Sequence, residues 1–146
     1  MKEIEILLIE DNPEDRDLTI MSLQRNKLAN RIEVARDGEE ALDFLFCRGA
    51  FADRTFDDAP KVVLLDIKLP KIDGLEVLKR IREKPATRFL PVAILTSSRE
   101  ESDLVRSYEL GVNAFVVKPV DFDQFINTVK DLGFFWAVVN EPPPNL

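Results

Sequence analysis

The stretch Lys61-Val62-Val63-Leu64-Leu65-Asp66 decides the fold class of this chain. Its four central residues are all apolar, and segments that contain Pro60 and Pro70 bound it on either side. A β-strand that is apolar at every position has to be covered on both faces, which is typical of a parallel sheet with helices on either side. The run ends in one carboxylate, Asp66, which the strand delivers to the edge of the sheet.

Segments of similar character recur along the chain and alternate with helical patterns. Further strands are expected at residues 4–9, 31–35, 91–96 and 114–117. Helices are expected to begin at capping positions, namely Asn12, Asp37, Asp73, Ser98 and Asp121. Gly111 is predicted to end the fourth helix, and residues 48–60 are expected to form a long connection. Five strands that alternate with five helices indicate an α/β fold with a doubly wound parallel sheet.

The composition narrows the range of functions. A length of 146 residues predicts a single domain over 1–146, with a proline-rich tail at about 140–146. A net charge of -7 argues against nucleic-acid binding, because an acidic protein does not displace counterions from phosphates. No apolar run approaches the roughly 20 residues that span a bilayer, and the acidic start does not suit a secretory signal, which together favour the cytoplasm. The absence of histidine leaves any chemistry to carboxylates, hydroxyls, lysine or a bound ion.

The carboxyl ends of the predicted strands carry the residues that suggest a function, because ligands of such folds bind at that edge. These residues are Glu10 and Asp11 after the first strand, Asp66 after the third, Thr96 at the end of the fourth and Lys118 after the fifth. Two carboxylates about 4 Å apart repel by roughly 4 kcal/mol at an effective dielectric near 20, so the cluster requires a cation or a proton. Oxygen ligands without histidine or thiolate suit a hard ion, above all Mg²⁺.

This set of residues predicts phosphoryl transfer to a carboxylate. An aspartate beside Mg²⁺ can attack phosphorus and become an acyl phosphate, and Asp66 is the candidate because it ends the most buried strand. Lys118 and Thr96 would supply further contacts to the equatorial oxygens. Taken alone, each residue also fits a structural role as a helix cap, a turn residue or a solvated lysine. Their joint occurrence at successive strand ends favours the functional interpretation.

Four ordered motifs make the chain resemble the receiver domain of bacterial two-component response regulators. They are Leu8-Ile9-Glu10-Asp11-Asn12, residues 63–70 with Asp73-Gly74, Ile94-Leu95-Thr96-Ser97, and Phe115-Val116-Val117-Lys118-Pro119. The resemblance extends to about Asp131, and it implies a flavodoxin-like sheet with strand order 2-1-3-4-5. It also implies a signalling protein, not an enzyme, that takes its phosphoryl group from a sensor histidine kinase. Because these 146 residues contain no histidine, the phosphohistidine has to lie outside them.

The resemblance implies a role for each residue at the strand ends. Asp66 would accept the phosphoryl group, Thr96 would donate a hydrogen bond to it and Lys118 would pair with it. Phe115 matches the aromatic switch position, although a phenylalanine in that strand is equally well a core residue. The Mg²⁺ ligands would be Glu10, Asp11, Asp66 and the backbone carbonyl of Lys68.

Signal output is expected through a protein contact or onward phosphate transfer. Phosphorylation would draw Thr96 inward and let Phe115 turn in, which would reshape the surface around the fourth and fifth strands. The consecutive aromatics Phe134, Phe135 and Trp136 are expected at a partner or homodimer interface, since one helix stripe cannot bury all three. In the alternative, the helix tucks two of them over the edge of the sheet.

Two features are similar to response regulators that pair with bacterial phytochromes. They are the long connection that contains Phe46-Cys47-Arg48-Gly49 and the C-terminal stretch 133–144 with its aromatics and prolines. The resemblance therefore predicts a phytochrome-type kinase as the phosphodonor.

Three other functions compete with this prediction. One is a degenerate receiver that binds partners without phosphorylation, although all five site residues are kept. Another is an aspartate-nucleophile phosphatase, which expects a second Asp two positions after its nucleophile, whereas Asn12-Pro13 follow Asp11. A nucleotide- or flavin-binding protein is the third, and it is disfavoured by the lack of a glycine-rich loop after the first strand.

Overall fold

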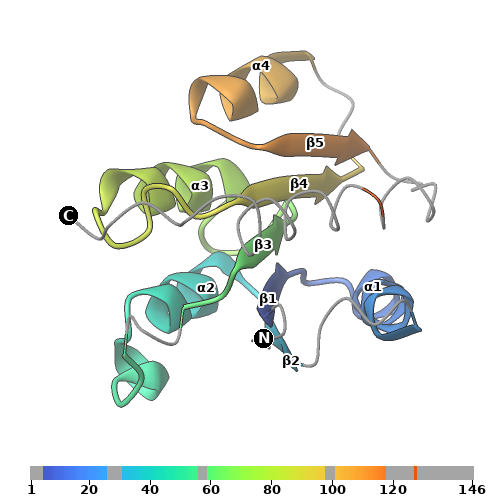
Figure 1. Ribbon diagram of the computed structural model, residues 1–146. Helices are drawn as coiled ribbons and strands as arrows, with labels where there is room; N and C mark the ends of the chain where they lie inside the picture. The colour runs from blue at the N-terminus through green and yellow to red at the C-terminus, as the bar shows by residue number, and fades with distance from the viewer. Residues whose placement is uncertain (1–4, 26–30, 56–58, 98–100, 118–126, 128–146) are drawn as a thin grey trace.

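A five-stranded parallel sheet forms the centre of the computed structural model, which describes residues 5–25, 31–55, 59–97, 101–117 and 127. The sheet order is β2-β1-β3-β4-β5, and every neighbouring pair of strands is parallel (Figure 1). The strands are β1 (Glu5–Ile9), β2 (Arg31–Ala35), β3 (Val62–Leu65), β4 (Val92–Thr96) and β5 (Ala114–Val117). The predicted fold class and strand order are confirmed.

Helices lie on both faces of the sheet. α1 covers one face, α2 and α3 cover the other, and α4 lies beside β5 (Figure 1). The described helices are α1 (Pro13–Arg25), α2 (Gly38–Leu45), the short 3₁₀ helix η1 (Gly49–Phe51), α3 (Gly74–Glu83) and α4 (Glu101–Glu109). None of the helices within the described ranges is long and apolar enough to cross a membrane. The helix predicted from Asp121 and the tail predicted at 140–146 lie outside the described residues.

Side chains fix the starts of three helices in the way that the sequence predicts. The carboxylates of Asp37 and Asp73 each accept a hydrogen bond from the backbone N–H three residues later, at 2.8 and 3.1 Å. The Oδ1 atom of Asn12 accepts the equivalent bond at 3.0 Å. Each such cap satisfies a backbone donor that the helix leaves unpaired and typically contributes about 1 kcal/mol. The predicted cap Ser98 lies outside the described residues.

Two helices end at a residue in the left-handed conformation. Gly111 has φ of 85° and donates its N–H to the carbonyl of Tyr108 at 3.1 Å, while Val112 donates to Ser107 at 3.0 Å. This pair of bonds is the Schellman motif, which confirms the prediction for Gly111. α2 ends with Cys47 at φ of 55°, a conformation that costs a residue other than glycine roughly 1–2 kcal/mol.

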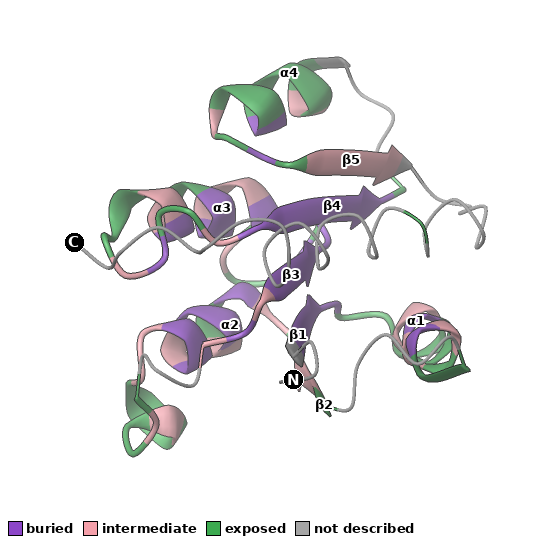
Figure 2. Ribbon diagram, in the orientation of Figure 1, coloured by how far each residue is buried: buried purple, intermediate pink, exposed green. Residues whose placement is uncertain are grey.

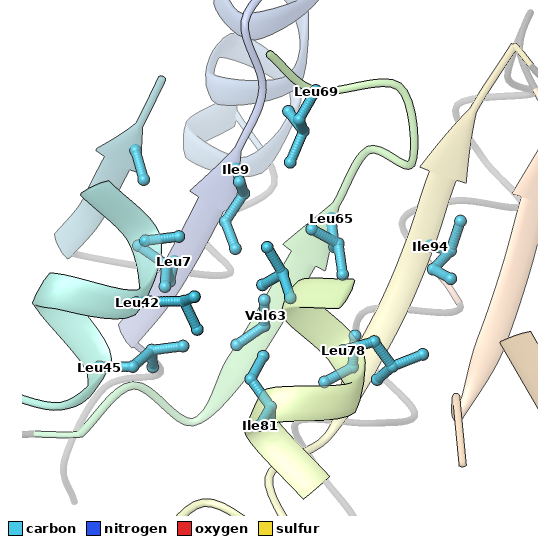
Figure 3. Packing of buried hydrophobic residues seen from close by; sticks show 14 of the residues in the cluster. Leu7, Ile9, Leu42, Leu45, Val63, Leu65, Leu69, Leu78, Ile81 and Ile94 are labelled. Atoms are coloured by element: carbon cyan, nitrogen blue, oxygen red, sulfur yellow. The ribbon is translucent and has the colours of Figure 1, made fainter. Parts of the chain in front are cut away.

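The larger core cluster lies between the sheet and the helices α2 and α3. Alternate residues of β1, β3 and β4 point toward this side, where they meet leucine and isoleucine side chains of the two helices (Figure 3). The residues labelled there include Leu7, Ile9, Val63, Leu65 and Ile94 of the sheet, Leu42 and Leu45 of α2, and Leu78 and Ile81 of α3. Full burial of one such side chain contributes about 1.5–3 kcal/mol, so this layer is a main source of stability.

A smaller cluster covers the opposite face of the sheet. Leu64 and the other residues of β1, β3 and β4 that alternate with those of the larger cluster pack here with Leu23 of α1. All four residues of β3 are therefore fully buried, and β1 and β4 are buried along most of their length (Figure 2). This burial on both faces explains why the stretch 62–65 is apolar at every position.

The connection over residues 48–60 contains η1, which the sequence pattern did not indicate. Phe51 packs edge-on against the ring of Phe44, with ring centroids 5.2 Å apart. The guanidinium carbon of Arg54 lies 3.6 Å from the centroid of the same ring, on which it forms a cation–π contact. Phe44 belongs to the larger core cluster, so these contacts anchor the connection to α2.

Candidate functional site

Three carboxylates meet at the carboxyl-terminal edge of the sheet. Glu10 follows β1 and Asp66 follows β3, and these strands are neighbours with Ile9 opposite Leu65. One carboxylate oxygen from each of Glu10, Asp11 and Asp66 lies within 4.8 Å of the other two. The sequence expectation that the strand ends bring these residues together is therefore correct in its geometry.

The sheet continues one residue beyond β1 and β3 and so holds two of the carboxylates firmly. The N–H of Glu10 donates to the carbonyl of Ala35 at 3.0 Å, and the N–H of Asp66 donates to the carbonyl of Ile9 at 3.1 Å. Glu10 is 2% exposed and Asp66 is 8% exposed, whereas Asp11 is open to solvent. The cluster thus has a buried base and one exposed side, from which an ion can approach.

The loop after Asp66 packs tightly against the start of α3. The N–H of Lys68 donates to Oδ1 of Asp66 at 3.1 Å, and the N–H of Gly74 donates to the carbonyl of Ile67 at 2.7 Å. A Cβ atom at Gly74 would lie 2.2 Å from the carbonyl oxygen of Asp66 and 2.6 Å from Cα of Ile67. Only glycine fits between the end of β3 and α3, so Gly74 helps to set the position of Asp66.

Lys71 anchors the same loop to the start of α2. Its ammonium lies 3.4 Å from a carboxylate oxygen of Asp37 and 3.6 Å from one of Glu39. These two carboxylates, Asp37 more than Glu39, raise the pKa of Lys71. Lys71 has φ of 65°, a left-handed conformation that the neighbouring residue types do not predict. Both partners of Lys71 lie at the start of α2, far from it in the sequence, so no local pattern indicates this contact.

Thr96 and Phe115 lie on the two strands on the far side of β3. Thr96 ends β4, is fully buried and stands opposite Val117 in the sheet. Phe115 stands opposite Ile94 and packs, half-buried, against the larger core cluster. This packing is compatible with both roles considered for Phe115.

Several predicted residues lie beyond the described part of the chain. β5 ends at Val117, directly before Lys118, and Lys118 itself is outside the described residues. The same holds for the predicted interface residues Phe134, Phe135 and Trp136.

The donor set of the cluster suits a hard divalent cation. Glu10, Asp11 and Asp66 contribute only carboxylate oxygens, and the exposed side leaves space for water and phosphate oxygens. The mutual repulsion of three carboxylates at this separation favours such an ion further.

The comparison with protein families agrees with this arrangement. The family model of the response regulator receiver domain matches residues 6–130. The chain belongs to this family. Receivers are signalling domains that accept phosphate from sensor histidine kinases and bind a divalent metal, and the acidic cluster of this receiver fits that property.

Three relatives show where this receiver stands within the family. The bacteriophytochrome response regulator AtBRR is 57% identical, with a TM-score of 0.80 over 97% of this chain and 100% of its own. The bacteriophytochrome response regulator RtBRR is 55% identical, with a TM-score of 0.81 over 99% of this chain and 86% of its own. Response regulator Rcp1 of Synechocystis sp. is 35% identical over 131 residues, which are 90% of this chain and 87% of Rcp1. The Mn²⁺-bound structure of Rcp1 has a TM-score of 0.79 over 97% of this chain and 99% of its own.

Proposed function

We propose that this receiver accepts a phosphoryl group on Asp66 and passes the signal on through a change of surface. The observation that carries the proposal is the approach of Glu10, Asp11 and Asp66 to within 4.8 Å at the edge of the sheet. A buried, firmly held carboxylate next to two others, open to solvent on one side, is suited to nucleophilic attack on phosphorus.

Mg²⁺ is the cation proposed for the cluster. Its ligands would be carboxylate oxygens of Glu10, Asp11 and Asp66, with the backbone carbonyl of Lys68. When bound, Mg²⁺ supplies neutralisation of the charge on the phosphoryl oxygens. The Mn²⁺-bound form of Rcp1 supports a divalent ion in a related protein.

The proposed transfer balances without a further reactant. A carboxylate oxygen of Asp66 attacks phosphorus, a P–O bond forms, and the P–N bond of the donor phosphohistidine breaks with its electron pair passing to the imidazole. Thr96 would donate a hydrogen bond to one phosphoryl oxygen, and the ammonium of Lys118 would pair with another. Hydrolysis of the acyl phosphate by water would return Asp66 and release inorganic phosphate.

Intact mass spectrometry tests the acceptor. The protein is incubated with Mg²⁺ and acetyl phosphate, and we expect one added phosphoryl group. The variant Asp66→Asn keeps the oxygen that accepts from Lys68 but loses the nucleophile, so it should gain none. Asp53→Asn, on the exposed surface, is the matched control and should be phosphorylated like the wild type.

The outcome also separates the competing functions. The absence of an adduct from any small donor or kinase would support a degenerate receiver that binds without phosphorylation. Steady release of phosphate from phosphomonoesters would support an aspartate-nucleophile phosphatase.

The proposed phosphodonor is a phytochrome-type sensor histidine kinase in the cytoplasm. The support is the likeness to AtBRR and RtBRR, both named bacteriophytochrome response regulators, at 57% and 55% identity. Phosphotransfer from a panel of purified, prephosphorylated kinases tests it. Equal rates from phytochrome-type and unrelated kinases would contradict the pairing.

The proposed output is a contact with a downstream protein or phosphotransfer partner. Phosphorylation would draw Thr96 toward Asp66, and Phe115 would turn into the space that this vacates, which changes the surface formed by β4, α4 and β5. Such a two-state element needs only a local change of charge to shift its populations. Unchanged partner affinity in phosphorylated Thr96→Ala would contradict this coupling.

A homodimer is the proposed assembly, with Phe134, Phe135 and Trp136 at its interface. The support is the run of three large aromatics in the sequence. Sedimentation at micromolar concentration, with and without phosphorylation, tests it. A strictly monomeric mass in both states would rule the dimer out.

A further inference from the structure

Lys68 links the loop after the acceptor to α4. Its ammonium lies 3.6 Å from a carboxylate oxygen of Asp103 in the first turn of that helix. The two side chains differ in exposure, with 58% for Lys68 and 13% for Asp103. The pair therefore joins a solvent-facing cation to a largely buried anion on α4.

The same lysine stands next to the proposed phosphorylation site. Its backbone N–H donates to Oδ1 of Asp66 at 3.1 Å. An N–Cα bond is about 1.5 Å long, so Cα of Lys68 lies less than about 5 Å from that oxygen. A lysine ammonium on its flexible four-carbon stem can therefore turn from Asp103 to a phosphoryl group on Asp66 without movement of the loop.

We propose that Lys68 is a second phosphoryl-binding lysine, held by Asp103 in the unphosphorylated protein and released to the phosphoryl group after transfer. The inference rests on the proposed function of Asp66. Phosphorylation replaces one negative charge at Asp66 by about two, which draws the ammonium away from Asp103. Asp103 and the phosphoryl group thus compete for one cation.

The competition has a defined sign and size. Any contact that is lost on phosphorylation opposes phosphorylation by the free energy of that contact. An ion pair whose cation is exposed to solvent, as Lys68 is, contributes about 0.2–1 kcal/mol, which corresponds to roughly a 1.5- to 5-fold change in affinity. The pair is therefore weak enough to exchange and strong enough to measure.

Beryllofluoride affinity in a double-mutant cycle tests the exchange. With Mg²⁺, beryllofluoride stands in for the phosphoryl group on an aspartate, and its binding does not depend on a kinase or on hydrolysis. Asp103→Asn should bind beryllofluoride about 1.5- to 5-fold more tightly than the wild type. Lys68→Met should bind it more weakly, and in that background Asp103→Asn should have no further effect.

A control on the same helix separates this exchange from a general change of charge. Glu109 lies on α4 and pairs with Arg106 at 3.8 Å, away from Lys68. Glu109→Gln removes the same charge and should leave beryllofluoride affinity unchanged. Tighter binding in both Asp103→Asn and Glu109→Gln would overturn the inference, because it would show a long-range field and not a shared cation.

Two further outcomes distinguish this inference from the proposed function. If the wild type binds beryllofluoride and Asp103→Asn binds it equally well, Asp66 remains an acceptor and the exchange is wrong. If the wild type and Lys68→Met both fail to bind beryllofluoride in the presence of Mg²⁺, the proposed function is wrong. The proposed exchange of Lys68 between Asp103 and the phosphoryl group is then wrong as well.

Discussion

Asp66 contacts two residues of the following segment through their backbones, Gly74 and Lys68. The backbone of Gly74 approaches the carbonyl of Asp66 so closely that a Cβ would not fit, and the N–H of Lys68 donates to the Asp66 side chain. The contact at Gly74 leaves no space for an added atom, and the hydrogen bond from Lys68 orients the carboxylate of Asp66. At the residue scale, the site is set by steric fit as well as by carboxylate chemistry.

Gly74→Ala tests this steric fit. The new Cβ would lie 2.2 Å from a backbone oxygen, which cannot move as a side-chain tip can, so we expect a loss of about 1–3 kcal/mol in the free energy of unfolding. Urea denaturation measures it. Lys79→Ala, on the exposed side of the same helix, should change stability by less than about 0.5 kcal/mol. A Gly74→Ala variant as stable as the wild type would show that the loop adapts.

Asp11→Asn should be more stable than the wild type without a divalent ion and less stable than the wild type with Mg²⁺. Without a divalent ion, removal of one of three clustered charges relieves repulsion, and the variant should be more stable by a few tenths of a kcal/mol. With Mg²⁺ at 100 times its dissociation constant, the wild type should gain about 2.7 kcal/mol and the variant less. Thermal unfolding with EDTA and with Mg²⁺ measures both differences. The same ranking of the two proteins under both conditions would contradict the proposed ligand role of Asp11.

At the scale of elements, Arg82 joins the end of α3 to two loops. Its guanidinium donates to the carbonyls of Gly111, Arg88 and Leu90 and to the side chain of Asn113, at 2.7–3.1 Å. Burial lowers the pKa of Arg82 to about 10, so it stays charged at neutral pH. Gly111 approaches the same side chain, because a Cβ there would lie 3.2 Å from Nε of Arg82. One side chain thus fixes α3, the start of β4 and the end of α4 together.

Arg82→Met keeps the stem and removes these bonds. We expect a loss of about 1.5–3 kcal/mol in the free energy of unfolding, the range for hydrogen bonds to a charged group. Arg80→Met is the matched control, because Arg80 forms a solvent-exposed i,i+4 pair with Glu76, and its loss should cost about 0.5 kcal/mol or less. Chemical denaturation compares the two variants. Equal losses would show that the network around Arg82 is replaced by water at no cost.

The sequence predicts the elements well and the links between them poorly. The caps at Asp37 and Asp73 and the helix end at Gly111 follow from local residue chemistry, and the structure confirms them. Gly111 and Asn113, which pair with Arg82, and Asp103, which pairs with Lys68, come from distant segments, so no local pattern predicts these contacts. The strand ends predicted the carboxylate cluster because parallel strands finish at one edge, which is a property of topology and not of side-chain packing.

At the scale of the whole molecule, β3 belongs to two cores at once. Leu64 packs in the smaller cluster and Leu65 in the larger one, and both are fully buried. Because one strand carries side chains into both layers, neither layer can be lost alone.

Leu64→Ala and Leu65→Ala test this shared strand. Each should lower the free energy of unfolding by about 2–5 kcal/mol, the usual cost of a cavity in a packed core. Each should also leave one transition, with circular dichroism and intrinsic fluorescence coincident, because the layers unfold together. A second transition in either variant would show that the two layers are separable.

The central position of β3 in the sheet also determines when the carboxylate cluster can form during synthesis of the chain. Its neighbours in the sheet are β1, which precedes it by more than 50 residues, and β4, which follows it. Contacts between segments so far apart form late, since the loops between them have to close first. A nascent chain therefore lacks the assembled carboxylate cluster until β1 and β3 have docked. Under the proposed function, unfinished chains on the ribosome would not accept phosphoryl groups. The signal would then depend on the number of fully folded receivers.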